Sequence, residues 1–211
     1  MPTVAILGAG NVGRALGERL LNIGCNVRFG VRDPSAAQSM LTGPLRGAVA
    51  LPPAAAGAEA KIVLLAVPAA AAVDACRSIG GLGGKILVDC TNPLRWDNGP
   101  VWAPPGEGSV AQALAVAFPM ASVIKGFNHF GAEIQRDPAM PGGPADAFFA
   151  GDDSNAKSEV MALAERMGFR AHDAGPLRNA AVLENLAVLW IQLAVAGGKG
   201  RNIAFRLESR S

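Results

Sequence analysis

The N-terminal half of the chain alternates short apolar runs with segments whose apolar residues recur every three or four positions. Continuous apolar runs predict parallel strands covered on both faces, and the longer repeat predicts amphipathic helices. Strands are predicted at residues 4–7, 26–31, 48–51, 61–67 and 85–90, and helices at 11–23, after 34 and at 69–75. Strands and helices that alternate through short connections predict an α/β fold with a Rossmann-like, doubly wound parallel sheet.

The pattern changes after residue 91. Residues 92–108 hold seven prolines or glycines together with Trp96 and Trp102, which predicts one long loop. Loops of that length are usually functional or disordered, and the two tryptophans favour a second ligand pocket here. Beyond the loop, strands are predicted at 122–127, 146–150 and 169–172, and helices from 109, at 154–167 and from 177 onward.

Composition narrows the classes of protein to consider. Half of the 211 residues are apolar and 17% are charged, which can form a large core and excludes a disordered chain. Glycine (26) and proline (15) indicate many tight turns. The net charge is +2 with basic residues scattered along the chain, so we expect no nucleic-acid partner.

We expect a cytoplasmic protein that does not span a membrane. The longest apolar stretches, 62–73 and 186–198, are interrupted by Pro68 and Gln192 and are shorter than the roughly 18 residues that a span needs. The N-terminus has neither a basic region nor a cleavage site, so no signal peptide is expected. The odd number of cysteines, without metal-ligand spacing, favours buried free thiols in a reducing compartment. These are Cys25, Cys76 and Cys90.

A glycine motif joins the first predicted strand to the first predicted helix. Gly8, Gly10 and Gly13, with Asn11 and Val12 between the last two, form a GxGxxG motif in the strand-turn-helix context that dinucleotide binding requires. The first glycine permits the tight turn, the second lets the backbone approach a pyrophosphate, and the third lets the helix pack against the strand. Free N–H groups at the helix start then bind phosphate. A plain glycine turn is the alternative.

The second predicted strand bears on which dinucleotide binds. An acid about 20 residues beyond the motif accepts the ribose hydroxyls of NAD, whereas an arginine there holds the 2′-phosphate of NADP. Counting 20 from Gly13 reaches Asp33, and Arg32 stands beside it. Spacing alone leaves both possible. The position of Arg32 directly after the strand favours NADP.

Several segments together resemble the F420-dependent NADP oxidoreductase family, whose members move hydride between NADP(H) and the deazaflavin coenzyme F420. The resemblance extends nearly from end to end of the chain. The nucleotide-binding half also resembles the cytosolic domain of membrane-bound ferric reductases. The matching segments are Gly8–Gly13, Gly30–Arg32, Asp173–Leu177, Glu184 and Gly198–Leu207.

The resemblance implies where the phosphate end of the cofactor binds. Arg32 falls where the family places its 2′-phosphate arginine. Val31 and Ala36 stand where the family often has serine and lysine, so phosphate donors are missing at both positions, and Ser35 is the neighbouring hydroxyl that can replace them in part. The pair Val67 and Pro68 matches the family's apolar-proline pair near the nicotinamide.

The resemblance also implies the ring end of the cofactor site. Thr91, Asn92 and Pro93 end a predicted strand at the edge where open α/β sheets bind ligands. The segment KGFNHFGAE resembles bacterial members. Asn128 stands where some archaeal members have a histidine, and in this chain the histidine, His129, follows one place later. His129 is the one candidate catalytic residue, with a structural role as the alternative.

The predicted function is therefore transfer of hydride between NADP(H) and a deazaflavin or flavin-type acceptor. Such transfer needs the two rings stacked and water excluded, without a metal or a nucleophile. An NADPH-dependent reductase of another small acceptor is one alternative, and a dinucleotide sensor without turnover is another. We expect residues 1–172 to form the NADP-binding Rossmann domain and residues 173–211 a helical segment that packs on it or on a second subunit.

The last predicted helix points to a homodimer. Leu183, Leu186, Trp190 and Leu193 form one apolar stripe, and Leu189 adds apolar surface on another side. A helix that is apolar nearly all round is buried, and in a chain of this size a partner subunit can supply part of that burial.

Overall fold

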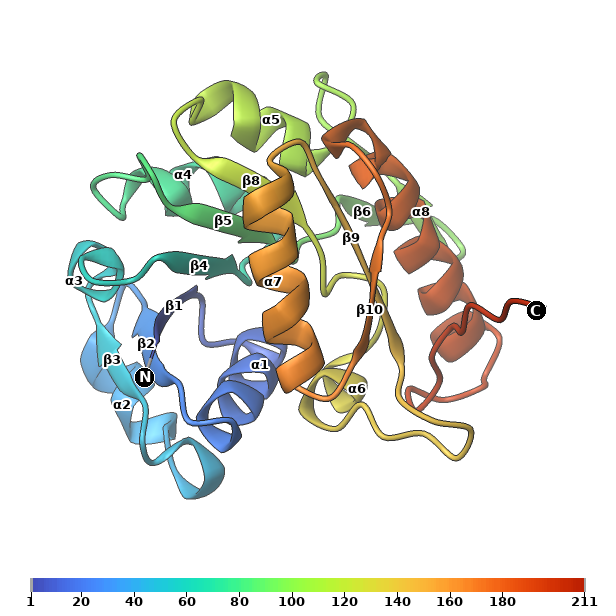
Figure 1. Ribbon diagram of the computed structural model, residues 1–211, viewed down its shortest axis with the longest axis horizontal. Coiled ribbons are helices and arrows are strands. Elements are labelled where there is room, and N and C mark those ends of the chain that lie inside the picture. Colours follow the sequence, from blue (N-terminus) through green and yellow to red (C-terminus); the bar gives the residue numbers. More distant parts are fainter. Residues whose placement is uncertain (1, 211) are drawn as a thin grey trace.

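The computed structural model describes residues 2–210, which fold around one eight-stranded sheet (Figure 1). The sheet order is β10-β9-β8-β5-β4-β1-β2-β3. Its strands are β1 (Thr3–Leu7), β2 (Asn26–Gly30), β3 (Val49–Leu51), β4 (Ile62–Leu65), β5 (Ile86–Asp89), β8 (Ser122–Lys125), β9 (Asp146–Gly151) and β10 (Arg170–Asp173). The Rossmann-like α/β fold that the sequence predicts is thus confirmed.

Helices cover both faces of the sheet because each central strand is apolar on both sides. Val4, Ile6 and Leu64 face α1 and α7, whereas Leu7 and Leu65 face α4 and α5. The α-helices are α1 (Asn11–Asn22), α2 (Pro34–Met40), α3 (Pro53–Gly57), α4 (Ala72–Arg77), α5 (Val110–Ala117), α6 (Ala132–Arg136), α7 (Ser154–Arg166) and α8 (Ala180–Ile191). The helix predicted at 69–75 begins as a 3₁₀ turn, Ala69–Ala71, and becomes α-helical only at Ala72.

The sheet is not parallel throughout, which corrects the sequence prediction. β9 pairs antiparallel with β8, and the edge strand β10 pairs parallel with β9, so β9 and β10 run antiparallel to the other six strands. The physical reason is the link between β8 and β9. This link holds Pro138, Pro141 and Pro144, and its one helix is the single-turn α6. No long helix therefore returns the chain to the end of the sheet where β8 begins, as a parallel strand would require. The helix α7 then makes the crossover from β9 to β10.

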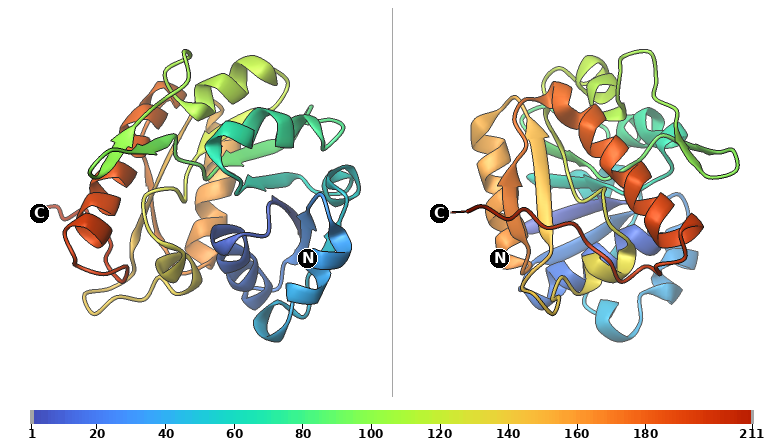
Figure 2. Two further views of the ribbon diagram at one scale, coloured as in Figure 1. Left: turned by 180° about the vertical axis from the view of Figure 1, so that it is seen from behind. Right: turned by 90° about the vertical axis from the view of Figure 1, so that its right-hand side faces the viewer.

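The predicted long loop at 92–108 contains a small hairpin, which is a second correction. β6 (Leu94–Trp96) pairs antiparallel with β7 (Pro100–Trp102). The turn between them has Asn98 at φ 53° and Gly99 at φ 156°, and the backbone of Asp97 donates to Gly99 O at 2.9 Å. An Asn-Gly pair is a strong hairpin signal, and it was present in the sequence. The hairpin lies beside α8 and projects away from the sheet (Figure 2).

Helix α8 lies along the β9–β10 end of the sheet (Figure 2). The predicted apolar stripe is only partly buried: Leu183 and Trp190 are buried, whereas Leu186 and Leu193 are half-buried. Glu184 and Ala187 complete the buried face of the helix. With the turns at both ends, residues 177–196 form a helical segment that is long and apolar enough to cross a membrane by length and composition alone. The core helix of a soluble protein passes the same test.

Candidate functional site

The turn between β1 and α1 depends on glycine at the positions that the motif predicts. Gly8 has φ 100°, and a Cβ there would lie 2.5 Å from Ala66 O. A Cβ at Gly13 would collide with Gly8 O, so only glycine lets α1 start this close to the strand. A Cβ at Gly10 would meet nothing within 4 Å, and no side chain caps the start of α1. The backbone N–H groups at that start therefore face open space, as an anion site requires.

A cleft of about 280 Å³ opens beside this turn, at the carboxyl ends of β1, β4 and β5. The chain leaves β1 toward β2 on one side, whereas β4 lies on the other, and ligands bind open α/β sheets at such a switch point. The lining residues are Gly10, Asn11, Val12, Ala66, Val67, Pro68, Ala69, Cys90, Thr91 and Asn92.

Seven of these lining residues were predicted from the sequence, and Ala66, Ala69 and Cys90 were not. The two alanines flank the predicted Val-Pro pair, and Cys90 is the residue before Thr91, so adjacency was the available signal. Burial and the nearby Asp89 charge raise the pKa of the Cys90 thiol well above its usual range. Cys90 is therefore a neutral wall residue of the cleft. All three cysteines are buried and free, as the sequence predicts.

The residues predicted to read the 2′-phosphate lie just outside the cleft. Arg32 and Ser35 are both exposed, between β2 and the first turn of α2. Asp33 is the N-cap of α2, and its Oδ1 accepts from Ala36 N at 3.0 Å. The carboxylate of Asp33 is thus engaged in a helix cap, whereas Arg32 projects into solvent. The structure thereby distinguishes the roles of Arg32 and Asp33, which spacing alone left open.

Two asparagines join the carboxyl ends of β5 and β8 at one side of the cleft. Asn92 Nδ2 donates to Asn128 O at 2.7 Å, and Asn128 Nδ2 donates to Asn92 Oδ1 at 2.8 Å and to Leu183 O at 2.9 Å. Asn128 is buried and does not line the cleft, so it acts on Asn92 rather than on a ligand in this arrangement. Pro93 is buried at the base of the hairpin.

Thr91 carries an unpaired polar atom beside the cleft. The residue is 4% exposed, and within residues 2–210 its Oγ1 has no hydrogen-bond partner. A buried hydroxyl without a partner costs about 1–3 kcal/mol, so a ligand atom that pairs with it gains affinity there.

Beneath the cleft lies a cluster of charges that the sequence analysis missed. Lys125 Nζ lies 2.8 Å from Asp89 Oδ2 and 3.2 Å from Glu184 Oε1, and all three side chains are fully buried. Asp89 and Lys125 are register partners at the ends of β5 and β8. A charge at the last position of each of two mainly apolar strands was the signal that could have revealed the pair.

His129 is buried next to Asn128 and does not line the cleft. Its ring packs against Phe130 and Phe148, and Nε2 lies 3.2 Å from Asp146 O. Burial lowers the pKa of His129 to about 4, so the imidazole is neutral at physiological pH. A catalytic role for His129 stays a prediction, and this placement gives it no contact with the cleft.

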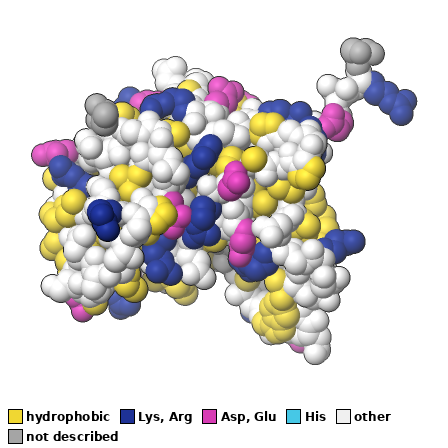
Figure 3. Space-filling model, turned by 90° about the horizontal axis from the view of Figure 1, so that it is seen from below, with side chains coloured by type: hydrophobic (Ala, Val, Ile, Leu, Met, Phe, Trp, Pro, Cys, Tyr) yellow, Lys and Arg dark blue, Asp and Glu magenta, His cyan; other side chains and the backbone are white. Residues whose placement is uncertain are grey.

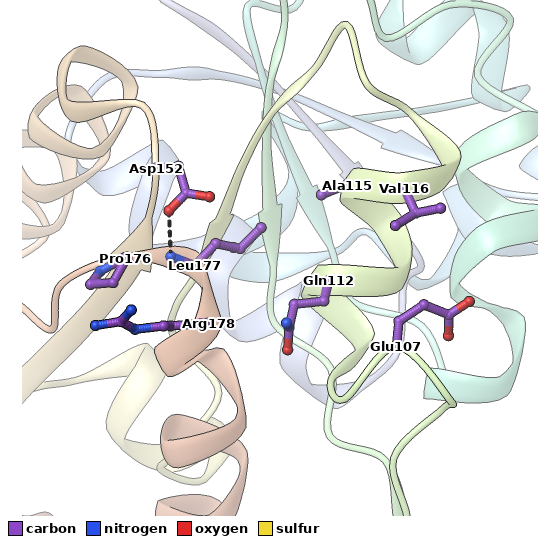
Figure 4. Close-up of a pocket in the computed structure, with 8 residues that line it drawn as sticks. All are labelled: Glu107, Gln112, Ala115, Val116, Asp152, Pro176, Leu177 and Arg178. Carbon is purple, nitrogen blue, oxygen red and sulfur yellow. Dashed lines mark hydrogen bonds between the residues drawn. The ribbon is translucent and has the colours of Figure 1, made fainter.

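A second hollow of the described chain lies away from this cleft. A groove of about 560 Å³ runs between α5 and the start of the C-terminal helical segment, with Glu107 and Arg178 on opposite sides (Figure 4). Its Asp152 accepts from Leu177 N at 2.8 Å. On the face shown in Figure 3, basic and acidic side chains are interspersed rather than gathered by sign. Within residues 2–210, no three His, Cys, Asp or Glu side chains are placed to hold a metal ion.

Comparison with known proteins places this geometry in a family. The family model for coenzyme F420-dependent NADP oxidoreductases matches residues 3–93. The F420-dependent NADP reductase of Methanothermobacter marburgensis is 31% identical over 98% of this chain and 98% of its own length. A crystal structure from Arthrobacter sp. FB24, described as an F420-dependent NADP-reductase, is 32% identical, superposes with a TM-score of 0.89 and covers 98% of this chain and 99% of that one.

The second resemblance predicted from the sequence is also confirmed. The metalloreductase STEAP3 of Rattus norvegicus is 32% identical over 87% of this chain, which corresponds to 36% of the length of that protein. The chain thus spans about a third of the metalloreductases it matches. The archaeal reductase, by contrast, matches from end to end, and on that basis the chain belongs to the F420-dependent family of NADP oxidoreductases.

Proposed function

We propose that the protein transfers hydride between NADP(H) and a deazaflavin or flavin-type acceptor, with the dinucleotide bound in the cleft at the glycine turn. The observation that carries this proposal is the open position of Gly10 beside uncapped N–H groups of α1. Together they form a cradle that a diphosphate fits, because the backbone can approach the anion without a Cβ in the way. Asn11 and Val12 line the same part of the cleft.

Arg32 supports NADP(H) over NAD(H). An acid near the end of β2 favours NAD, and one carboxylate oxygen of Asp33 is already engaged in capping α2. Arg32 projects into solvent next to Ser35, so its guanidinium is free to pair with a 2′-phosphate in the bidentate manner that suits arginine. The chain has one arginine here and lacks the serine and lysine that the family often adds at positions 31 and 36.

The inner end of the cleft suits a nicotinamide ring. Val67 and Pro68 offer it an apolar wall, and the unpaired hydroxyl of Thr91 offers a hydrogen bond to a carboxamide. Asn92, held by Asn128, forms the adjacent wall. When bound, the nicotinamide supplies the hydride. The residues of the chain orient the ring, exclude water and leave one face toward the acceptor.

Mixing the protein with NADPH and oxidised F420 under anaerobic conditions tests the proposal. We expect the absorbance band of the oxidised deazaflavin to disappear as NADPH is consumed. Turnover with a free flavin instead of F420 would identify the acceptor as the flavin type, whereas turnover only with a small carbonyl would contradict the proposed class of acceptor. Tight NADPH binding without turnover of any of these acceptors would contradict the proposal and favour a dinucleotide sensor.

We also propose a homodimer in the cytoplasm, with residues 1–172 holding the dinucleotide and residues 173–211 packing on that domain and on a second subunit. Val182 and Leu189 on α8 are 64% and 48% exposed, which leaves apolar surface for a partner copy to cover. Size-exclusion chromatography with light scattering tests this, and a monomer at micromolar concentration would contradict it. Recovery of the protein only in the membrane fraction would contradict the cytoplasmic placement.

A further inference from the structure

The β6–β7 hairpin is tied to α8 through one buried carboxylate. Trp102 on β7 donates its indole Nε1–H to Glu184 Oε2 at 2.9 Å. Glu184 is fully buried, and it is the one charged residue among the buried residues of α8. An indole N–H bonded to a buried charge is a strong and directional contact, so it fixes where β7 lies on α8.

The other oxygen of the same carboxylate leads to the cleft. Glu184 Oε1 accepts from Lys125 Nζ at 3.2 Å and from Val110 N at 3.0 Å. Lys125 in turn donates to Asp89 and to the carbonyl of Thr91. A continuous chain of hydrogen bonds therefore connects the hairpin to a residue of the cleft wall.

More than one hydrogen bond holds each charged member of this network in place. Asp89 Oδ1 also accepts from Thr91 N at 2.9 Å, so Thr91 is held at both its N–H and its carbonyl. Both carboxylates only accept, and the N-terminal end of α5 at Val110 offsets the second negative charge. A buried ionic network contributes little net stability compared with apolar packing, but it does fix geometry because no member can move without leaving a charge unpaired.

We propose that Glu184 is a positioning residue for hydride transfer, which fixes the Trp102 hairpin and the Thr91 wall of the cleft relative to each other. The inference rests on the proposed function and goes beyond it, because it assigns a role to a residue that touches neither ligand. The hairpin begins at Leu94, two residues beyond Asn92 of the cleft wall, so it adjoins the end of the cleft that we assign to the nicotinamide. Loosening it should weaken the use of acceptor, whereas the glycine turn that binds the dinucleotide stays intact.

The test is a double-mutant cycle on the Trp102–Glu184 hydrogen bond. Trp102→Phe keeps the ring and removes the donor, and Glu184→Gln keeps the shape and removes the charge. We expect each to raise the KM for the acceptor about tenfold, as expected for loss of a hydrogen bond to a charged group, with a much smaller change in the Kd for NADPH because the glycine turn stays intact. The double variant should be no worse than Glu184→Gln alone, because Glu184→Gln already disrupts the contact that Trp102→Phe removes.

Trp190→Phe is the matched control. Trp190 is also buried on α8 and donates its indole N–H, but to Ile203 O in the C-terminal tail. The control should lose stability to a similar degree and keep the native KM. Additive effects of the two test substitutions, or an equal rise in KM for the control, would overturn the inference.

Tryptophan fluorescence separates failure of the inference from failure of the proposed function. In a Trp96→Phe, Trp190→Phe background, Trp102 is the only tryptophan left. Adding Glu184→Gln should shift its emission and raise its quenching by acrylamide, since the hairpin is then released. An unchanged spectrum would overturn the inference even if the native protein turns over. Absence of turnover in the native protein would overturn the proposed function and the positioning role of Glu184 in hydride transfer with it, whatever the spectrum shows.

Discussion

Substitution of Gly10 by valine should abolish tight NADPH binding without harm to the fold. Gly10 has φ −74° and ψ −170°, which valine adopts readily, and a Cβ would meet nothing within 4 Å. The added methyl groups would instead occupy the space above the start of α1. Loss of two hydrogen bonds from backbone N–H to phosphate, at about 1.5–3 kcal/mol each, predicts a loss of at least about 3 kcal/mol, or more than a hundredfold in Kd.

Isothermal titration calorimetry measures the Kd for NADPH, and thermal unfolding measures stability in the same samples. Gly81→Val is the matched control, because a Cβ at Gly81 also meets nothing within 4 Å but the residue lies outside the cleft. We expect both variants to unfold within about 2 °C of the native protein, since surface substitutions rarely exceed about 0.5 kcal/mol. A Gly10→Val protein that binds NADPH as tightly as the native one would refute the reasoning.

Three further predictions concern single residues. Arg32→Ala should weaken NADPH binding by about 1.5–3 kcal/mol and leave NADH binding unchanged in calorimetric titrations, and equal losses for both would show that the arginine is structural. Lys125→Met should lower the free energy of unfolding in urea by about 3–5 kcal/mol, because Asp89 and Glu184 would be left buried without their cation, and a loss under about 1 kcal/mol would contradict this. Since burial lowers the pKa of His129 to about 4 from 6.5, the unfolded chain binds the proton more readily, and stability should fall by up to about 3 kcal/mol as pH drops from about 6.5 to about 4. In denaturant titrations across that range, His129→Gln should reduce the dependence of the free energy of unfolding on pH. An unchanged pH dependence would contradict a lowered pKa for His129.

The glycine turn and the first strands could be predicted because local rules determine them. The run Val4–Leu7 is buried on both faces, and Gly8 and Gly13 are required by close backbone contacts within a few residues. The caps of α5 and α7 at Ser109 and Asp153 follow from local chemistry in the same way. Such features need no knowledge of distant segments.

The reversal of β9 could not be read from periodicity, because an apolar strand looks the same in either direction. Only the proline-rich link between β8 and β9 carried the information, and its effect depends on where β9 docks. The Asn-Gly turn of the hairpin was readable but was outweighed by the surrounding prolines and glycines.

The charged cluster at Lys125 depends on contacts between distant segments. Asp89 and Lys125 are 36 residues apart, and Glu184 is 59 residues beyond Lys125. Glu184 was recognised only as part of a family resemblance. In sequence it resembles a solvent-facing charge on an apolar helix, and only the packing of α8 shows that it is buried.

A crystal structure of the protein grown with NADP⁺ tests the central claim most directly. We expect electron density for the diphosphate against the backbone N–H groups at Gly10, Asn11 and Val12, with the 2′-phosphate within hydrogen-bond distance of Arg32. Density for the dinucleotide in the groove between Glu107 and Arg178, or a glycine turn without ligand at saturating NADP⁺, would contradict it.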